Sequence, residues 1–416
     1  PKGVWRSAGN SDNFHVTLMR LPYDDAEDFK PFNSEGAWSA TIVEGGDDFI
    51  TLRSTVEGSG SDNAQQTGVK SIEGAGEHPI DFWIDFKGTI AENSTPRCAI
   101  VRVRYHNYTC EHDIYVRQGY APITIDGNAE SDKNPAWASY NVYRFDANNA
   151  PVYTKSPLEE GSLFRRGNRT AILASNNDRP GFTFGLGPSG SFDVLELGAT
   201  TPSQKTWSQL APSADDVKSR FASWSIAGDH ERIATIEDFY TLESTSIHSN
   251  IGKAYGVLYG DGATETQKSV EVALGYDHNE DPTNSKKGMR GCFVFNINNS
   301  HNIFFPIGKS GYGRRKGMTS NGEKVGALRY AQRTDYYNND GTGNIQYVPL
   351  FYDLFERPGA IYQCRNRLSS TGSDVKKSSA FDINYFTMGF EGFENGASNN
   401  SDGSDSDACF IRTVKY

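Results

Sequence analysis

The sequence has little methionine and no excess of basic residues. It contains 4 Met in 416 residues, and 41 Lys and Arg against 52 Asp and Glu, for a formal net charge of −11. This balance argues against nucleic-acid binding, because phosphate contacts require concentrated Lys and Arg. The one basic cluster, residues 309–316, is better explained as a solvated loop. No apolar run approaches the roughly 18 residues that span a bilayer, so we expect no transmembrane segment.

Cysteine is also scarce, and none of the cysteines forms a C-x-x-C pair, which excludes a zinc ribbon or a thioredoxin-type redox motif. We expect residues 97–105 and 110–118 to form a hairpin in which Cys110 faces Tyr105. Cys98 then lies near the far end of the hairpin, beyond disulfide reach. We interpret all five cysteines as buried small apolar side chains: Cys98, Cys110, Cys292, Cys364 and Cys409.

The motifs of common hydrolases and NTPases are missing as well. There is no Gly-x-Ser-x-Gly nucleophile elbow, no P-loop and no His-x-x-x-His pair, and His230-Glu231 is followed by no second zinc ligand. Asp and Glu are so numerous that two carboxylates at glycosidase spacing discriminate nothing. We therefore expect a protein that is not an enzyme.

Short runs that alternate apolar and polar residues fill the chain from residue 37 to 122, with glycine-rich turns between them. A period of two is typical of strands with one buried face, and several such strands favour a β-sandwich. We expect an Ig-like β-sandwich at residues 1–122. Its first 36 residues, with a strand at 14–21, belong either to this sandwich or to the remnant of an upstream domain.

A polar connection at residues 123–134 precedes a second domain at 135–416 with longer loops, so the predicted fold class is mainly β with α+β. A helix is expected at 235–243, where Thr235 can cap and Ile236, Phe239, Tyr240 and Leu242 face inward. The final strand, at 409–415, should pair back into a sheet. The other predicted elements are a helix at 215–225 and strands at 291–297, 302–308, 347–352 and 385–390.

The hairpin at residues 97–120, which ends in Val116-Arg-Gln-Gly, resembles the closing hairpin of BACON-type and fimbrillin-associated sandwich modules. Such modules are common in surface proteins of gut Bacteroidetes. The resemblance implies an Ig-like sandwich and an extracellular, cell-surface or outer-membrane-associated location, including lipoproteins. The chain begins at Pro1 without an initiator Met or signal peptide, so we expect it to come from a longer precursor, and export stays open.

The second domain resembles the Fibrobacter succinogenes major paralogous (FISUMP) domain, a family with a C-type-lectin-like fold. The resemblance rests on five segments in the family's order, although Ala234 stands where the family usually has Pro and a Trp-Ser-Ser element is missing. It implies an irregular, C-type-lectin-like α+β domain. The segments are the Trp-Ala-x-x-Asn-Val run at 137–142, the Arg-Ile-Ala-Thr helix start at 232–242, an apolar strand pair with a Gly-Tyr loop at 293–312, a Gly-x-x-x-Tyr element at 326–334, and Phe-x-Arg-x-Val-Lys within 409–415, where the family has one more residue between Phe and Arg.

Exposed aromatic rings beside Arg, Asn and Asp are typical of carbohydrate sites, and one tyrosine-rich stretch offers both kinds of side chain. The candidate ligand-binding residues are Tyr312, Arg314, Tyr330, Arg333, Asp335, Tyr336 and Tyr337. Two acidic loops, at 277–281 and 402–407, hold several oxygen ligands each and are either solvated loops or calcium sites. The metal candidates are Asp402, Asp405 and Asp407. No other cofactor is expected.

Together these features predict a non-catalytic cell-surface or fimbria-associated protein involved in cell adhesion. The sandwich would act as a spacer, and the lectin-like domain would bind a glycan or a host or partner protein. Two alternatives stay open: a glycan-processing enzyme, and a structural pilus subunit that binds other pilus subunits by accepting a donor strand at an open sandwich edge.

Overall fold

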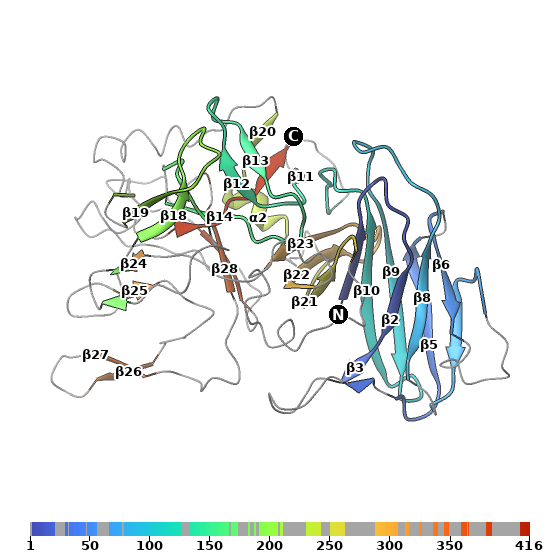
Figure 1. Cartoon of the computed structure of the whole chain (residues 1–416). Coiled ribbons are helices and arrows are strands. Elements are labelled where there is room, and N and C mark those ends of the chain that lie inside the picture. Colours follow the sequence, from blue (N-terminus) through green and yellow to red (C-terminus); the bar gives the residue numbers. More distant parts are fainter. Residues whose placement is uncertain are drawn as a thin grey trace. The chain divides into compact units, whose positions relative to one another are not determined.

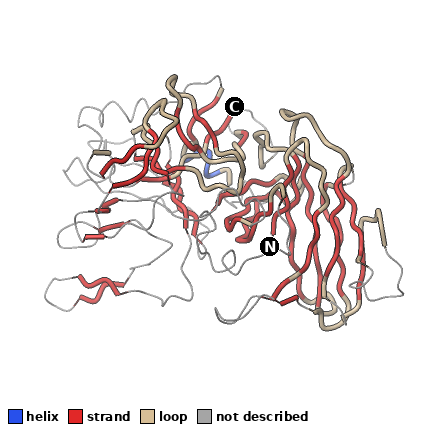
Figure 2. The backbone as a smooth tube through the Cα atoms, in the orientation of Figure 1, coloured by secondary structure: helices blue, strands red, loops and turns tan. Residues whose placement is uncertain are grey.

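The predicted mainly-β fold is confirmed by a computed structural model, in which strands are the dominant element and the only helix among the described residues is α2 (Figures 1 and 2). No helix in this part of the chain is long and apolar enough to span a membrane. The structure describes residues 2–20, 30–31, 33–46, 48–55, 66–76, 79–126, 134–165, 168–173, 182–183, 187–188, 191–206, 209–210, 230–242, 250–262, 288–306, 313–315, 324–326, 336–339, 345–348, 359–363, 365, 380–384 and 408–416.

The chain divides into two compact units, each made of two stretches of sequence. Unit 1 consists of Pro1–Asn128 and Ser244–Phe305, and unit 2 consists of Ala129–Glu243 and Pro306–Tyr416. The predicted linker at 123–134 contains the point, between Asn128 and Ala129, where the chain first passes from unit 1 to unit 2. The predicted second domain, however, included residues 244–305, which the structure groups with the N-terminal residues.

In unit 1, two sheets enclose one hydrophobic core, and β3 and β4 form a separate strand pair. An eight-stranded sheet has the order β23-β22-β21-β1-β10-β9-β5-β7, and a three-stranded sheet has the order β2-β8-β6. The core draws on both, with Trp38 and Val101 from the first and Phe14, Phe82 and Ile84 from the second. The strands are β1 (Lys2–Arg6), β2 (Phe14–Thr17), β3 (Met19–Arg20), β4 (Lys30–Pro31), β5 (Trp38–Gly45), β6 (Ile50–Ser54), β7 (Ser71–Gly74), β8 (Asp81–Phe86), β9 (Arg97–Tyr105), β10 (Cys110–Gln118), β21 (Ile251–Tyr259), β22 (Met289–Asn296) and β23 (Asn302–Pro306).

The predicted β9–β10 hairpin is confirmed in its register. Cys110 pairs with Tyr105, and Cys98 lies at the other end opposite Arg117. Cys98 and Cys292 are buried free thiols, as predicted. The prediction was wrong for Cys110, which is exposed because it begins its strand directly after the turn. The side chains of Cys364 and Cys409 lie outside the described residues.

The β1 strand joins the sandwich to the strands that come from much later in the sequence. It runs parallel to β10 on one side, with Val4 opposite Val116, and parallel to β21 on the other, with Val4 opposite Tyr259. All five of its residues are buried. A Cβ atom on Gly3 would lie 2.3 Å from the Phe293 ring, so glycine permits the close approach of that ring. The β21, β22 and β23 strands thus extend the N-terminal sheet.

Buried side-chain bonds also fix the segment that follows β10. The Asn296 amide donates to the carbonyls of Ile125 and Asp126, each at 3.0 Å. The His301 Nδ1 lies 2.7 Å from the Thr124 carbonyl oxygen, to which a neutral ring with a proton on Nδ1 donates. Ser300 Oγ donates to the Cys98 carbonyl at 2.8 Å. Residues 124–126 are therefore held against the β22–β23 turn.

We expect the half-buried His301 to make unit 1 less stable in mild acid. Burial is the main reason that its pKa is lowered, and the Arg117 charge lowers it further. The unfolded chain, with a His pKa of about 6.5, therefore takes up the proton first as the pH falls. We expect the free energy of unfolding to fall as the pH drops through the unfolded value and to level off below the folded one. Urea unfolding at pH 7.5 and 5.5 should show a smaller loss for His301→Asn, which does not titrate. An equal loss in both proteins would contradict this assignment.

The described residues of unit 2 form small sheets and one short helix. A three-stranded sheet has the order β11-β31-β20, and a five-stranded sheet has the order β19-β18-β15-β14-β30. Its core includes Val142, Phe145, Phe164 and Ile411. The elements are β11 (Ala136–Trp137), β12 (Val142–Phe145), β13 (Pro151–Tyr153), β14 (Ser162–Arg165), β15 (Ala171–Leu173), β16 (Phe182–Thr183), β17 (Gly187–Pro188), β18 (Ser191–Leu195), β19 (Ser203–Thr206), β20 (Glu231–Ile233), α2 (Ile236–Tyr240), β24 (Gly313–Arg315), β25 (Lys324–Gly326), β26 (Tyr336–Asn339), β27 (Ile345–Val348), β28 (Gly359–Gln363), β29 (Ala380–Asn384), β30 (Ala408–Cys409) and β31 (Thr413–Lys415).

The chain end pairs back into unit 2, as predicted. Val414 in β31 lies between Trp137 of β11 and Arg232 of β20. Just before it, Cys409 of β30 pairs with Phe164 of β14, and Phe410 forms a parallel bridge to Tyr362 of β28. Residues 408–415 therefore connect two sheets and a third strand pair. The predicted helix at 215–225 and the strand at 385–390 lie outside the described residues.

Candidate functional site

The structure describes only part of the predicted ligand site. Arg314 lies in β24 opposite Val325 of β25, while Tyr336 and Tyr337 lie in β26 opposite Val348 and Tyr347 of β27. These two hairpins are separate two-stranded sheets. The positions outside the described residues are Tyr312, Tyr330, Arg333, Asp335, Asp402, Asp405 and Asp407.

Calcium binding stays a prediction for the same reason. Both acidic loops, 277–281 and 402–407, lie outside the described residues. Within the described residues, no three His, Cys, Asp or Glu side chains gather in a way that could hold a metal ion.

Unit 2 does bring together segments that are far apart in the sequence, around the buried Arg412. Its Nε donates to Asn141 Oδ1 at 2.8 Å, and its NH1 donates to the Ala138 carbonyl at 2.8 Å. The Asn141 amide nitrogen in turn donates to the Tyr362 hydroxyl at 3.0 Å and to the Glu160 carbonyl at 2.6 Å. The Arg412 guanidinium lies 5.9 Å from the centroid of the Tyr362 ring.

This polar cluster is structural rather than accessible to a ligand. Arg412 and Tyr362 have no exposed surface, and Asn141 has almost none. Burial lowers the pKa of the Arg412 guanidinium and raises the pKa of the Tyr362 hydroxyl, because both charged forms lose water. An arginine nevertheless keeps its proton in proteins, so its N–H groups remain donors. The cluster fixes β31 against residues 138–141.

The α2 helix adds a second ordered feature beside β20. Thr235 caps it, accepting a bond from the Asp238 N–H at 3.2 Å, while the Asp238 carboxylate accepts one from the Thr235 N–H at 2.7 Å. This reciprocal pair is a capping box, and the predicted cap and the inward Phe239 and Leu242 are confirmed. Asp238 also receives two bonds from Arg232, one of them from NH2 to Oδ1 at 2.9 Å.

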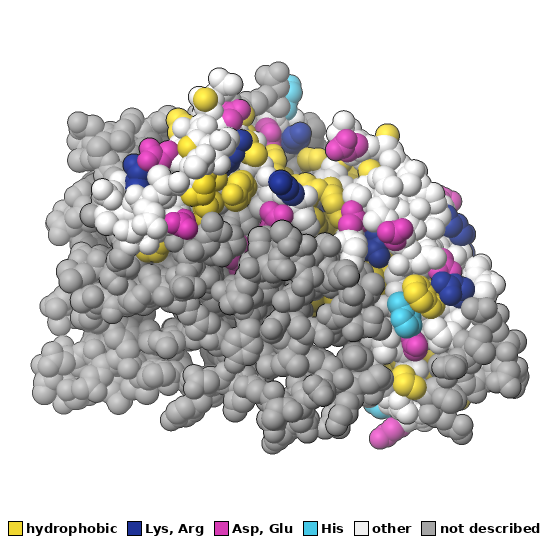
Figure 3. Space-filling view, in the orientation of Figure 1, with side chains coloured by type: hydrophobic (Ala, Val, Ile, Leu, Met, Phe, Trp, Pro, Cys, Tyr) yellow, Lys and Arg dark blue, Asp and Glu magenta, His cyan; other side chains and the backbone are white. Residues whose placement is uncertain are grey.

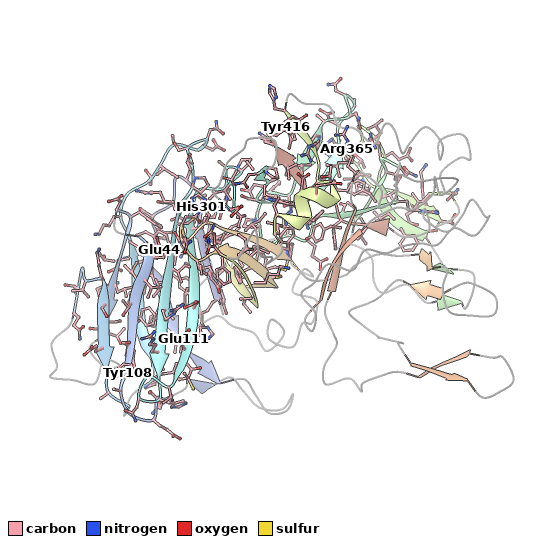
Figure 4. The ribbon with its side chains drawn as sticks, turned by 180° about the vertical axis from the view of Figure 1, so that it is seen from behind. Glu44, Tyr108, Glu111, His301, Arg365 and Tyr416 are labelled. Carbon is pink, nitrogen blue, oxygen red and sulfur yellow. The ribbon has the colours of Figure 1, made fainter. Side chains whose placement is uncertain are left out.

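Arg232 also contacts Tyr416, which in turn contacts His230. We call these three side chains the Tyr416 surface. Arg232 Cζ lies 5.1 Å from the centroid of the Tyr416 ring, and the His230 ring meets it edge to face at 6.1 Å. The Tyr416 N–H donates to the His230 carbonyl at 3.1 Å. Tyr416 is 54% exposed, and Figure 4 labels it at the periphery of unit 2. The group offers a ring and polar edges but no activated nucleophile.

A second aromatic group, on the outward face of β2-β8-β6 in unit 1, has a different geometry. The His15 ring stacks on Trp83 at 4.5 Å and 11°, and Arg53 Cζ lies 4.8 Å from the indole centroid. Because β8 runs between β2 and β6, these two side chains cover opposite faces of the indole. Trp5 and Trp38 are fully buried, whereas Trp83 is only partly buried. Trp83 offers a ligand no open ring face.

Sequence analysis found no second zinc ligand for His230, gave it no binding role and did not single out Tyr416. The motifs at 232–242 and 409–415 were the sequence features that could have indicated this site, because the Tyr416 surface lies where these two segments pair. A tyrosine outside any motif cannot be recognised as a binding residue from the sequence. Comparison with known proteins adds no family, since no protein-family model and no curated protein matches the chain.

Proposed function

We propose that this chain is a non-catalytic recognition protein of the cell surface or of fimbriae, in which unit 2 binds a glycan or a host or partner protein. The observation that carries the proposal is the meeting of three of the five FISUMP-like segments. Residues 137–142, 232–242 and 409–415 supply β11, β20 with α2, and β31. These segments lie far apart in the sequence but pair in one sheet, β11-β31-β20, and this meeting favours a C-type-lectin-like unit.

Unit 1 fits the role of a spacer. Its two larger sheets share one core, and the β9–β10 hairpin on which the BACON-like resemblance rests lies inside the eight-stranded sheet. Such a core supports an Ig-like sandwich. On the opposite face of the larger sheet, buried aromatic rings pack onto the later strands, as where the ring centroids of Tyr115 and Phe293 lie 5.2 Å apart.

The alternative of a structural pilus subunit is less well supported, because the sheet edge beside β10 is not open. A donor strand needs an open strand edge. Next to β10, that position is taken by β1, and the other side of β1 is taken by β21. A side-chain bond also joins β1 to the residue after β21, since Arg6 NH1 donates to the Gly260 carbonyl at 2.8 Å. We call the position of β1 between β10 and β21 the seam of unit 1.

The proposed function is tested by binding of the fluorescently labelled full chain to host epithelial cells and to a glycan array, each with calcium and with EDTA. We expect selective, saturable binding without chemical change of the bound glycans. Release of reducing ends from bound glycans would overturn the proposal in favour of the enzyme alternative. Absence of binding to both cells and array would favour the structural pilus subunit.

A further inference from the structure

We propose that the Tyr416 surface is a stacking site for an uncharged glycan, with the Tyr416 ring as its platform. This inference rests on the proposed function and names its ligand class and its site. It uses Arg232 of β20, His230 just before that strand and Tyr416 just after β31, and none of the tyrosines in residues 312–337.

The platform is held in place before any ligand arrives. Arg232 lies under the ring and is itself fixed by two bonds to Asp238, whose carboxylate also caps α2. The backbone bond from Tyr416 to His230 continues the β20–β31 pairing by one residue pair. A preorganised aromatic ring loses little conformational freedom when it binds, which favours affinity.

The tyrosine ring is exposed to solvent, whereas the side chains that hold it are largely buried. The side chains of Arg232 and Asp238 are 17% and 4% exposed, whereas Tyr416 is 54% exposed. His230 holds a left-handed backbone conformation, with φ at 58°. This conformation costs a non-glycine residue about 1 kcal/mol or more. Its ring stands nearly perpendicular to the tyrosine ring, at 87°.

The charges at the surface favour a neutral ligand. The Arg232 charge is matched by Asp238, so the pair attracts neither an acidic nor a basic group strongly. Across the face shown in Figure 3, the described acidic and basic side chains are interspersed. A pyranose presents an apolar C–H face that can lie on the ring and hydroxyl groups that can bond to the tyrosine hydroxyl and the imidazole of His230.

The probes for the test are maltohexaose, cellohexaose and mannohexaose, titrated into the full chain by calorimetry. We expect at least one to bind, with an affinity that changes little between 0.05 and 0.5 M NaCl. Tyr416→Ala should weaken it about tenfold or more, whereas Tyr416→Trp, which keeps a ring, should bind within a few fold of the parent. Tyr108→Ala is the matched control, because Tyr108 is similarly exposed, at 47%, but lies on the β9–β10 turn of unit 1 (Figure 4).

Each contrary outcome has one meaning. If a hexaose binds and Tyr416→Ala leaves its affinity unchanged, the site is overturned and the proposed function stands. If none of the hexaoses binds while the full chain binds cells, the uncharged-glycan assignment is overturned and recognition of another ligand stands. If binding is lost in 0.5 M NaCl, the ligand class is wrong. A Tyr416→Ala chain that does not fold leaves the decision to Tyr416→Ser and His230→Ala, of which at least one must weaken binding.

Discussion

Replacing Arg412 with Met is expected to destabilise unit 2 by about 2–5 kcal/mol, because each buried acceptor that loses its donor costs about 1–3 kcal/mol. Met fills much of the volume but donates no hydrogen bond. Asn141 Oδ1 and the Ala138 carbonyl would lose donors that lie 2.8 Å away, in the buried interior of the unit. Arg412→Lys should recover only part of the loss, because an ammonium group cannot reproduce the planar donor geometry.

Amide hydrogen exchange followed by mass spectrometry measures this loss locally. In Arg412→Met, exchange should accelerate in β11, β20 and β31, which the cluster holds together, while β9 and β10 in unit 1 stay protected. Lys415→Ala is the control on the same strand, since Lys415 is exposed and its removal should change stability by less than about 0.5 kcal/mol. Equal exchange in Arg412→Met and the parent would show that the network contributes no net stability.

The parts of the fold that the sequence predicts are those determined by neighbouring residues. Alternation over 97–118 predicts the β9–β10 hairpin to the residue pair, because register follows from the short turn. The cap of α2 is likewise a local pattern, with Thr235 and Asp238 three residues apart. The candidate site is partly local as well, since both of its strand segments carry recognisable motifs.

The parts that sequence did not predict depend on distant partners. The β1 strand is buried at every position, so it shows no alternation, and it has only five residues. In β21, glycine weakens the strand signal, and the reason for glycine at 252 is the Phe295 ring on the paired strand. A parallel pairing over about 250 residues leaves no trace in either segment. The Tyr416 surface is similar, because the contact between Arg232 and Tyr416 exists only once β20 and β31 have paired.

The second large expected effect concerns Trp5, at the seam that joins the two stretches of unit 1. Trp5→Ala should destabilise unit 1 by about 3–5 kcal/mol, the usual cost of truncating a fully buried aromatic residue. The indole N–H donates to Asn302 Oδ1 of β23 at 3.0 Å, and Arg117 Cζ lies 4.6 Å from the ring centroid. The substitution therefore leaves a cavity, an unpaired amide oxygen and a guanidinium without its aromatic partner.

Trp83→Ala tests whether this effect reflects position rather than residue type. Trp83 also has an arginine over its ring, at 4.8 Å, but it is only partly buried and lies on the outward face of β8. Its removal should cost less than about 2 kcal/mol, from a smaller cavity and one lost cation–π contact. Urea unfolding gives the two free energies, and hydrogen exchange gives their location. Trp5→Ala should expose β21, β22 and β23 together with β1, because the later strands reach the sandwich through β1. If β21–β23 kept full protection while β1 exchanged freely, the later strands would be stable without the seam, and the sandwich edge beside β10 would be open to a strand from another chain.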